Sequence, residues 1–121
     1  MLKKLNKIAK KVIRKERSKG DVCITLADDT MLRVLNRVYR HIDKATDVLS
    51  FFMGEEGLLG DIVISKDSAA RNAERFGVTI DEEMKRLVVH GTLHLLGYDH
   101  QKRSERLRMS EKEDRYAKEI S

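Results

Sequence analysis

The sequence has no proline, no tryptophan and a single cysteine among its 121 residues. One cysteine, Cys23, cannot form an intramolecular disulfide, which excludes a small secreted scaffold held together by disulfides. Because Cys23 lies in an alternating apolar stretch, we expect an ordinary buried thiol in a reducing compartment. No apolar run approaches the roughly 20 residues of a membrane span or the core of a signal peptide. These absences favour a cytoplasmic protein.

Acidic residues are scarce at the start of the chain. Residues 1–20 hold nine basic side chains and one acidic side chain, Glu16, whereas the remaining 101 residues hold 16 basic and 19 acidic ones. The net charge of +5 therefore comes from one segment. Basic segments attract phosphate and so favour nucleic acid, but lysines on an outer helix face are also commonly just solvated. Aromatic residues make up only 5% of the chain, so no aromatic-rich stacking platform is expected.

Apolar periodicity predicts helices interleaved with three short strands. The helices are expected at 2–17, 29–39, 67–76, from about 80 into the histidines near 90, and at 104–119, and the strands at 21–27, 46–52 and 61–65. This alternation indicates the α/β (α+β) class, in which helices cover a small mixed sheet of about three or four strands. The length predicts a single domain over residues 1–121.

Polar residues and glycines mark the expected ends of these helices. Asp28 or Asp29 can cap the second helix, and Gly77 can close the third. Thr79 and Glu82 have the T-x-x-E form of a capping box, which predicts a helix start just before residue 80.

Two details of packing are also predicted. In the second helix, Leu32, Leu35 and Val38 are expected to face inward. Three glycines over residues 54–60 predict a loop between the second and third strands.

Three of the four histidines lie in HGTLHLLGYDH, residues 90–100. His90 and His94 are about 40° apart on a helix, so both imidazoles can reach one ion. Gly97 can provide a left-handed turn that returns His100 to the same ion. Three histidines leave one tetrahedral position open, as in catalytic zinc sites. The spacing therefore predicts a zincin-like metal helix that binds one Zn²⁺.

Other metal chemistry stays open at this point. A closed structural site would need a fourth protein ligand, for which His41, Asp61 and Asp99 are candidates. Asp99 could instead orient an imidazole through its second nitrogen or cap the turn. Nickel, copper or iron also bind imidazole, because affinity alone does not select zinc.

Gly91 stands where the zinc-peptidase pattern H-E-x-x-H has its acid-base glutamate. Glycine inside a helix costs roughly 0.5 to 1 kcal/mol relative to alanine. Its presence predicts room for substrate or close packing by a neighbouring element. Zinc lowers the pKa of bound water to about 7, so the missing glutamate argues against a standard peptidase but not against hydrolysis.

Three segments resemble the YbeY family of bacterial single-strand-specific endoribonucleases. The string from His90 to His100 matches its H-G-x-L-H-L-x-G-Y-D-H signature at every position. LNRVYRHIDKATDVLSF (35–51) resembles its L-N-x-x-Y-R-x-x-D-x-x-T-D-V-L-S-F block, and LGDIVIS (59–65) resembles its L-G-D-I-x-I-S strand. The resemblance covers much of residues 35–100.

The resemblance implies a zinc-dependent ribonuclease that matures the 3′ end of small-subunit ribosomal RNA and acts in ribosome quality control. Its implied partners are ribosomal RNA and the small ribosomal subunit or its proteins, with no membrane. It also implies that Arg40 is catalytic, together with the metal ligand His90. A guanidinium can clamp a phosphate and stabilise its charge. From the residues alone, an ion pair of Arg40 with Asp43 or Asp47 is the alternative.

Some positions match the family without indicating a role, and others depart from it. Thr46, Asp47, Ser50 and Asp61 match, but hydrogen bonding at strand ends explains them equally well. Phe52 stands where members often carry proline, and His41 where they often have a small or polar residue; His41 is either an RNA contact or a solvated loop residue. A first strand expected before the first helix is missing, so the sheet is expected to be small.

The sequence therefore predicts a metal-assisted phosphodiester hydrolase. Two rivals stay open. One is a zinc peptidase whose base comes from another segment, and the other is a non-catalytic ribosome assembly factor with a structural metal.

Overall fold

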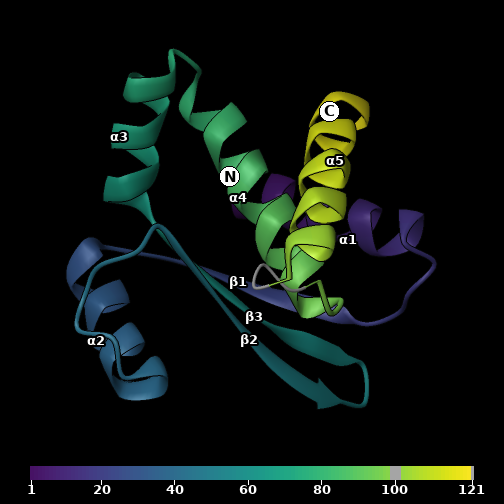
Figure 1. Cartoon of the computed structure of the whole chain (residues 1–121), viewed down its shortest axis with the longest axis horizontal. Coiled ribbons are helices and arrows are strands. Elements are labelled where there is room, and N and C mark those ends of the chain that lie inside the picture. The colour runs from purple at the N-terminus through teal and green to yellow at the C-terminus, as the bar shows by residue number, and fades with distance from the viewer. Residues whose placement is uncertain (99–101, 121) are drawn as a thin grey trace.

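The computed structural model describes residues 1–98 and 102–120, which form helices and strands in alternation (Figure 1). In chain order these are α1 (Leu2–Lys15), β1 (Asp21–Ala27), α2 (Asp29–Arg40), β2 (Val48–Glu55), β3 (Leu58–Ser65), α3 (Lys66–Phe76), α4 (Ile80–Leu95) and α5 (Arg103–Glu119). The sheet has the order β1-β3-β2, with β1 parallel and β2 antiparallel to β3. The predicted α/β (α+β) class and small mixed sheet are confirmed.

Helices pack on both faces of this sheet because side chains alternate along its central strand β3. Ile62 and Ile64 face a large core formed with α1, α4 and α5. Val63 faces the opposite side, where it packs with Leu32 of α2 and Leu49 of β2 in a small cluster. In Figure 1, α2 accordingly lies apart from the group formed by α1, α4 and α5. The sheet thus separates one thick apolar layer from one thin layer.

The capping residues predicted for α2 and α4 are confirmed. The Asp28 carboxylate accepts a hydrogen bond from the Met31 amide at 2.9 Å, and the Thr79 hydroxyl accepts one from the Glu82 amide at 3.1 Å. Gly77 closes α3 with φ of 68°, a left-handed conformation that glycine adopts without strain. The Thr79 cap sets the start of α4, the helix that carries His90 and His94.

Glu16, at the C-terminal end of α1, ties this helix to the later part of the chain. Its carboxylate accepts hydrogen bonds from the Tyr98 hydroxyl and the Lys112 ammonium, each at 2.6 Å, and from the Tyr116 hydroxyl. Burial by itself raises the pKa of Glu16, but the bonds from Lys112, Tyr116 and Tyr98 outweigh it and hold the pKa below its usual value. The single acidic residue of the basic segment therefore anchors α1 to α5.

The predicted glycine loop between β2 and β3 is wrong. The two strands form a hairpin that closes at Glu56 and Gly57, with φ of 79° at Gly57. Gly60 lies within β3, where a Cβ atom would come 2.3 Å from the Phe51 carbonyl oxygen. The glycines here serve a tight turn and close strand packing, which a count of turn-forming residues does not distinguish from a loop.

The predicted environments of two side chains are also wrong. Val38 is 55% exposed because it lies about 240° around α2 from Leu32, away from the sheet. Asn36 is buried in its place and donates a hydrogen bond to the Lys44 carbonyl at 2.9 Å. Cys23 is exposed, since it lies on β1 while α2 packs over β2 and β3.

Among the helices of the described residues, none combines the length and the apolar character that a membrane span requires.

Candidate active site

The helix α4 places His90 and His94 side by side, one turn apart. Their ring centroids are 4.8 Å apart and the ring planes meet at 73°. The helix ends at Leu95, and Gly97 follows with φ of 104°, the positive φ that the sequence predicts for this turn. The third predicted ligand, His100, lies outside the described residues, as does Asp99.

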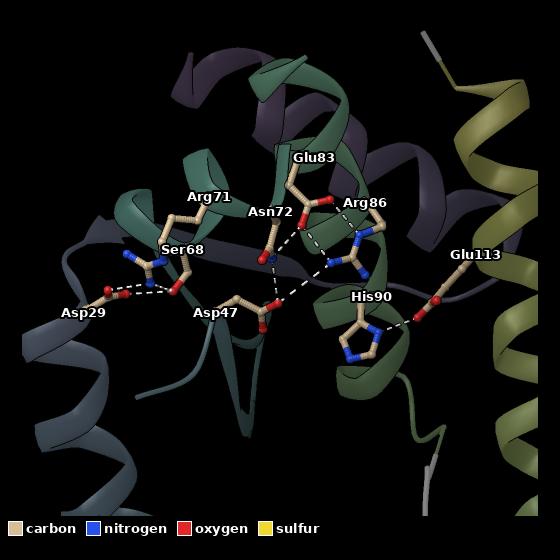
Figure 2. Close-up of polar contacts among 9 residues, drawn as sticks. All are labelled: Asp29, Asp47, Ser68, Arg71, Asn72, Glu83, Arg86, His90 and Glu113. Atoms are coloured by element: carbon tan, nitrogen blue, oxygen red, sulfur yellow. Dashed lines mark hydrogen bonds and ion pairs between the residues drawn. The ribbon is translucent and has the colours of Figure 1, made fainter. Parts of the chain in front are cut away.

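Glu113 of α5 holds the ring of His90. Its carboxylate bonds Nδ1 of the imidazole, as Figure 2 shows. An ionised carboxylate can only accept, so in the neutral imidazole this contact selects the tautomer with the proton on Nδ1 and the lone pair on Nε2. Both side chains are about one-fifth exposed, at 21% and 20%. This contact fixes the tautomer and the orientation of one candidate metal ligand.

Contacts on both sides of Glu113 hold α5 against the rest of the molecule. Met109 and Tyr116 are buried in the main core. The ammonium of Lys85, from α4, donates to the carbonyls of Ala117 at 2.7 Å and Ile120 at 3.0 Å. A helix anchored in this way holds its carboxylate in place beside α4.

His90 and His94 open onto a cavity of about 470 Å³ between the C-terminal part of α4, the strand β2 and the end of α2. It is lined by Asn36, Arg40, Ile42, Thr46, Asp47, Val48, Leu49, Ser50, Phe52, His90, His94 and Leu95. Folding thus brings Arg40 to the same cavity as the two histidines. Among the other family-matched residues, Thr46, Asp47 and Ser50 line the cavity.

Arg40 is held by contacts with β2. Its guanidinium donates a hydrogen bond to the Ser50 carbonyl at 2.8 Å and lies 5.8 Å from the centroid of the Phe51 ring. The two carboxylates considered as its partners are engaged elsewhere. Asp43 bonds Arg33 through two contacts, at 2.8 and 3.1 Å, and Asp47 lies 3.8 Å from Arg86.

Gly91 lies where α4 packs on the sheet. A Cβ atom at this position would come 3.0 Å from the Ser50 hydroxyl and 3.1 Å from a methyl group of Ile62. The Ser50 hydroxyl also donates to the Gly91 carbonyl at 3.2 Å. Of the two interpretations of Gly91, close packing by a neighbouring element is the one observed.

A polar network continues from the cavity along α4 (Figure 2). Glu83, which is 1% exposed, accepts hydrogen bonds from Arg86 at 2.8 and 2.7 Å and from Asn72 at 2.9 Å. Asn72 also donates to Asp47 at 3.2 Å. The bond to Glu83 raises the pKa of Arg86 above its ordinary value. A buried carboxylate is thereby neutralised by a fixed cation, and Asp47 is held at the edge of the cavity.

The described residues contribute two imidazoles to the predicted metal site. Within residues 1–98 and 102–120, no three His, Cys, Asp or Glu side chains are grouped so that they could hold an ion. His41 is exposed at the C-terminal cap of α2, with φ of 60°, and Asp61 lies within β3 between Cys23 and Phe51. Neither lines the cavity. Two adjacent imidazoles, one of them oriented by a carboxylate, are a donor set that suits Zn²⁺.

Sequence reasoning did not identify Glu113. It lies 23 positions after His90 in a helix of which most residues are charged, so no spacing distinguishes it from its neighbours. The one available signal is Met109 and Tyr116, an apolar pair that sets which face of the last helix meets the core.

Comparisons with known proteins agree on one family. The sequence model described as Endoribonuclease YbeY matches residues 1–121. The curated Endoribonuclease YbeY of Aquifex aeolicus is 53% identical over 89 residues, covering 70% of this chain and 59% of its own length. That of Treponema denticola is 51% identical over 89 residues, covering 66% and 57%. The chain thus spans a little over half the length of these two relatives.

Other relatives match over more of both sequences. The Endoribonuclease YbeY of Pelotomaculum thermopropionicum is 44% identical over 121 residues, covering 91% of this chain and 80% of its own length. The solution structure of TM1509 from Thermotoga maritima is 32% identical and superposes with a TM-score of 0.72, covering 98% of this chain and 80% of that one. The chain belongs to the YbeY family.

Proposed function

We propose that this protein is a zinc-dependent endoribonuclease that cleaves single-stranded RNA. In this proposal His90, His94 and His100 bind one Zn²⁺, and Arg40 and His90 are the catalytic residues. The observation that carries it is that Arg40 and the two histidines, which are far apart in the sequence, line one cavity. The names of the relatives, Endoribonuclease YbeY, support RNA as the substrate class.

The biological setting is proposed on the family resemblance. The substrate would be ribosomal RNA in the cytoplasm, cleaved during maturation of the 3′ end of the small-subunit RNA and during ribosome quality control. The small ribosomal subunit or its proteins would be the partners that deliver it.

Arg40 is suited to bind the phosphate of the scissile bond. A guanidinium has several N–H donors, so the bond to the Ser50 carbonyl orients the group and leaves donors for phosphate oxygens. Because its charge is permanent, Arg40 would stabilise the negative charge that develops as the phosphodiester is attacked.

His90 and Glu113 prepare the other side of the cavity. The carboxylate of Glu113 keeps the proton on Nδ1 and thereby presents Nε2 as the ligand atom. A bound Zn²⁺ supplies Lewis acidity toward the phosphoryl group and lowers the pKa of water. The attacking group is either water or the 2′-hydroxyl of the RNA, and a 2′,3′-cyclic phosphate on the product would identify the hydroxyl.

The geometry favours RNA over a peptide substrate. Extended peptides commonly bind by pairing their backbone with a sheet edge, and β2 is an edge strand of this sheet. At that edge, the Arg40 guanidinium already donates a hydrogen bond to the Ser50 carbonyl, which is the acceptor that a paired peptide backbone would need. In addition, Gly91 packs against Ser50 and Ile62, so no carboxylate at this position can act as a base.

Cleavage of a single-stranded RNA, combined with metal analysis, tests the proposal. We expect the purified wild type to contain about one zinc ion per chain, to cleave the RNA and to lose activity on chelation. His94→Ala should lose both zinc and cleavage. Casein is the matched substrate for the peptidase alternative, and its cleavage without RNA cleavage would reject a ribonuclease.

The same samples test the assembly-factor alternative. If the metal is only structural, Arg40→Ala should keep full activity in ribosome assembly while chelation lowers the melting temperature. A wild type that carries zinc but leaves RNA intact under all conditions would favour that alternative.

A further inference from the structure

Phe52 is an exposed aromatic residue at the edge of the cavity. The residue is 67% exposed, although phenylalanine is usually buried. It lines the cavity of Arg40 and His94. It also lines a second hollow of about 360 Å³ at the hairpin end of the sheet, with Lys19, Gly20, Gly54, Glu55, Gly57, Leu58 and Leu59. Phe52 is therefore the wall that these two hollows share.

The ring of Phe52 rests on the backbone of Gly54. A Cβ atom at Gly54 would come 2.7 Å from one ring carbon and 3.0 Å from another. The glycine adopts φ of 64°, which disfavours any other residue there. Gly54 therefore provides the surface that supports one side of the ring and restricts its position.

Phe52 differs in this respect from the other two phenylalanines. The ring of Phe76 lies within 6 Å of two guanidinium groups, those of Arg75 at 5.7 Å and Arg86 at 5.9 Å. The ring centroids of Phe51 and Tyr39 are 5.3 Å apart, and the guanidinium of Arg40 lies 5.8 Å from the Phe51 centroid. No comparable ring or cation contact to Phe52 occurs within residues 1–98 and 102–120. Its ring is available to stack on a planar ligand.

We propose that Phe52 is a nucleobase-stacking residue for single-stranded RNA. The inference rests on the proposed ribonuclease function and identifies how the substrate strand is held. A base next to the scissile phosphate stacks on the Phe52 ring, while the backbone runs from the cavity of Arg40 to the hollow of Lys19. Stacking on an aromatic ring contributes about 1–3 kcal/mol per base and requires little sequence specificity.

The charges around Phe52 favour RNA over a protein partner. Arg40 lines the hollow on one side of the ring and Lys19 the hollow on the other. Each lining also holds one carboxylate. Asp47 is hydrogen bonded to Asn72 and lies near Arg86, and Glu55 lines the hollow of Lys19 but not the cavity of Arg40. Two cations that flank an exposed ring match the alternation of phosphates and bases along a single strand.

Steady-state cleavage of single-stranded RNA by the zinc-loaded protein tests the proposal. Phe52→Ala should raise KM by about 5- to 150-fold, from the loss of one stacked base. Phe52→Trp should retain a KM near that of the wild type. Phe76→Ala removes another exposed phenylalanine, one that lines neither this cavity nor the hollow of Lys19, and should change neither KM nor kcat. In wild type, 2-aminopurine placed next to the cleavage site should lose fluorescence on binding, and Phe52→Ala should abolish this quenching.

Three results would overturn the proposal. In the first, Phe52→Ala cleaves RNA with the KM of the wild type, which rejects stacking and leaves the ribonuclease function standing. In the second, Phe52→Ala keeps this KM and loses binding to a ribosomal protein, which makes Phe52 a protein contact. In the third, the wild type neither binds nor cleaves single-stranded RNA, which rejects the proposed function and the stacking role of Phe52 with it.

Discussion

The two walls of the cavity differ in how firmly their functional side chains are held. On the α4–α5 wall, His90 is only 21% exposed and is fixed by Glu113, from a helix that Met109 and Tyr116 anchor in the core. On the α2–β2 wall, Arg40 and Phe52 are exposed, and the apolar cluster beneath α2 is small.

This difference separates two tasks. A metal ligand loses affinity if its ring can rotate, so rigid positioning is useful on the first wall. A side chain that meets a flexible polymer has to adapt to it, and exposed residues over a thin layer allow small movements. We therefore expect substitutions on the two walls to have different signatures: metal affinity on one and substrate handling on the other.

The largest effect on the α2–β2 wall is expected for Arg40→Ala. Removing a group that stabilises charge in the transition state typically lowers kcat by about 10²- to 10³-fold. Zinc content and melting temperature should stay near the wild-type values, because Arg40 is exposed and bonds only a carbonyl among the contacts described. Arg40→Lys keeps the charge but not the fork of donors, and should recover only part of the rate. Loss of zinc in Arg40→Ala would contradict the division between the walls.

A smaller effect, on zinc affinity rather than on kcat, is expected from replacing Glu113. Loss of a carboxylate that orients a metal-binding histidine typically weakens metal affinity by about 10- to 100-fold. Glu113→Ala should show this loss in a zinc-chelator competition assay, while Glu113→Gln, whose amide oxygen can still accept from Nδ1, should lose less. The neighbouring Asp114→Ala is the matched control on the same helix. Equal zinc affinity in wild type and Glu113→Ala would reject the orienting role.

The smallest effect concerns the attachment of α2. The Asp29 carboxylate accepts hydrogen bonds from the hydroxyls of Ser65 and Ser68, at 2.6 and 2.7 Å, and from Arg71 at 2.6 Å. Figure 2 shows its contacts with Ser68 and Arg71. The bonds from Ser65, then Ser68, lower the pKa of Asp29 to about 2 from its usual 3.8. Since the folded-state pKa is the lower one, the ionised carboxylate stabilises the fold above pH 4, and this stabilisation is lost as the pH falls toward 2.

Denaturant unfolding of wild type and Asp29→Asn across this range measures the effect. At pH 6 the free energy of unfolding should be larger for the wild type by only on the order of 1 to 2 kcal/mol, because solvent partly screens the exposed Asp29 carboxylate. This difference in the free energy of unfolding between wild type and Asp29→Asn should become smaller as the pH falls from 4 to 2. A difference that is constant with pH would show that the charge of Asp29 has no role.

Local chemistry made much of this fold predictable. The Asp28 and Thr79 caps depend on hydrogen bonds to a backbone amide three residues away, so neighbouring residues are enough to identify them. The spacing of His90 and His94 on one helix face likewise depends only on the helical period. The shared cavity of Arg40 and the histidines was implied by the family resemblance rather than by any spacing.

Features that depend on tertiary packing were not predictable in this way. Cys23 was expected to be buried, but its exposure depends on which strands α2 covers. The contact between Glu113 and His90 depends on how α5 docks, and no local pattern encodes that. The spacing of turn-forming residues predicts Gly54 and Gly60 in a loop, whereas their role in the strands depends on the neighbouring Phe52 and Phe51.

The anchoring of α5 has a consequence for the order in which the protein becomes competent during synthesis. Glu113 and the partners of Glu16 on the same helix follow every strand of the sheet along the chain. A nascent polypeptide can therefore form its sheet and α4 before His90 gains its carboxylate. With the proposed activity, the site therefore reaches its full affinity for zinc only after nearly all of the described chain has been made.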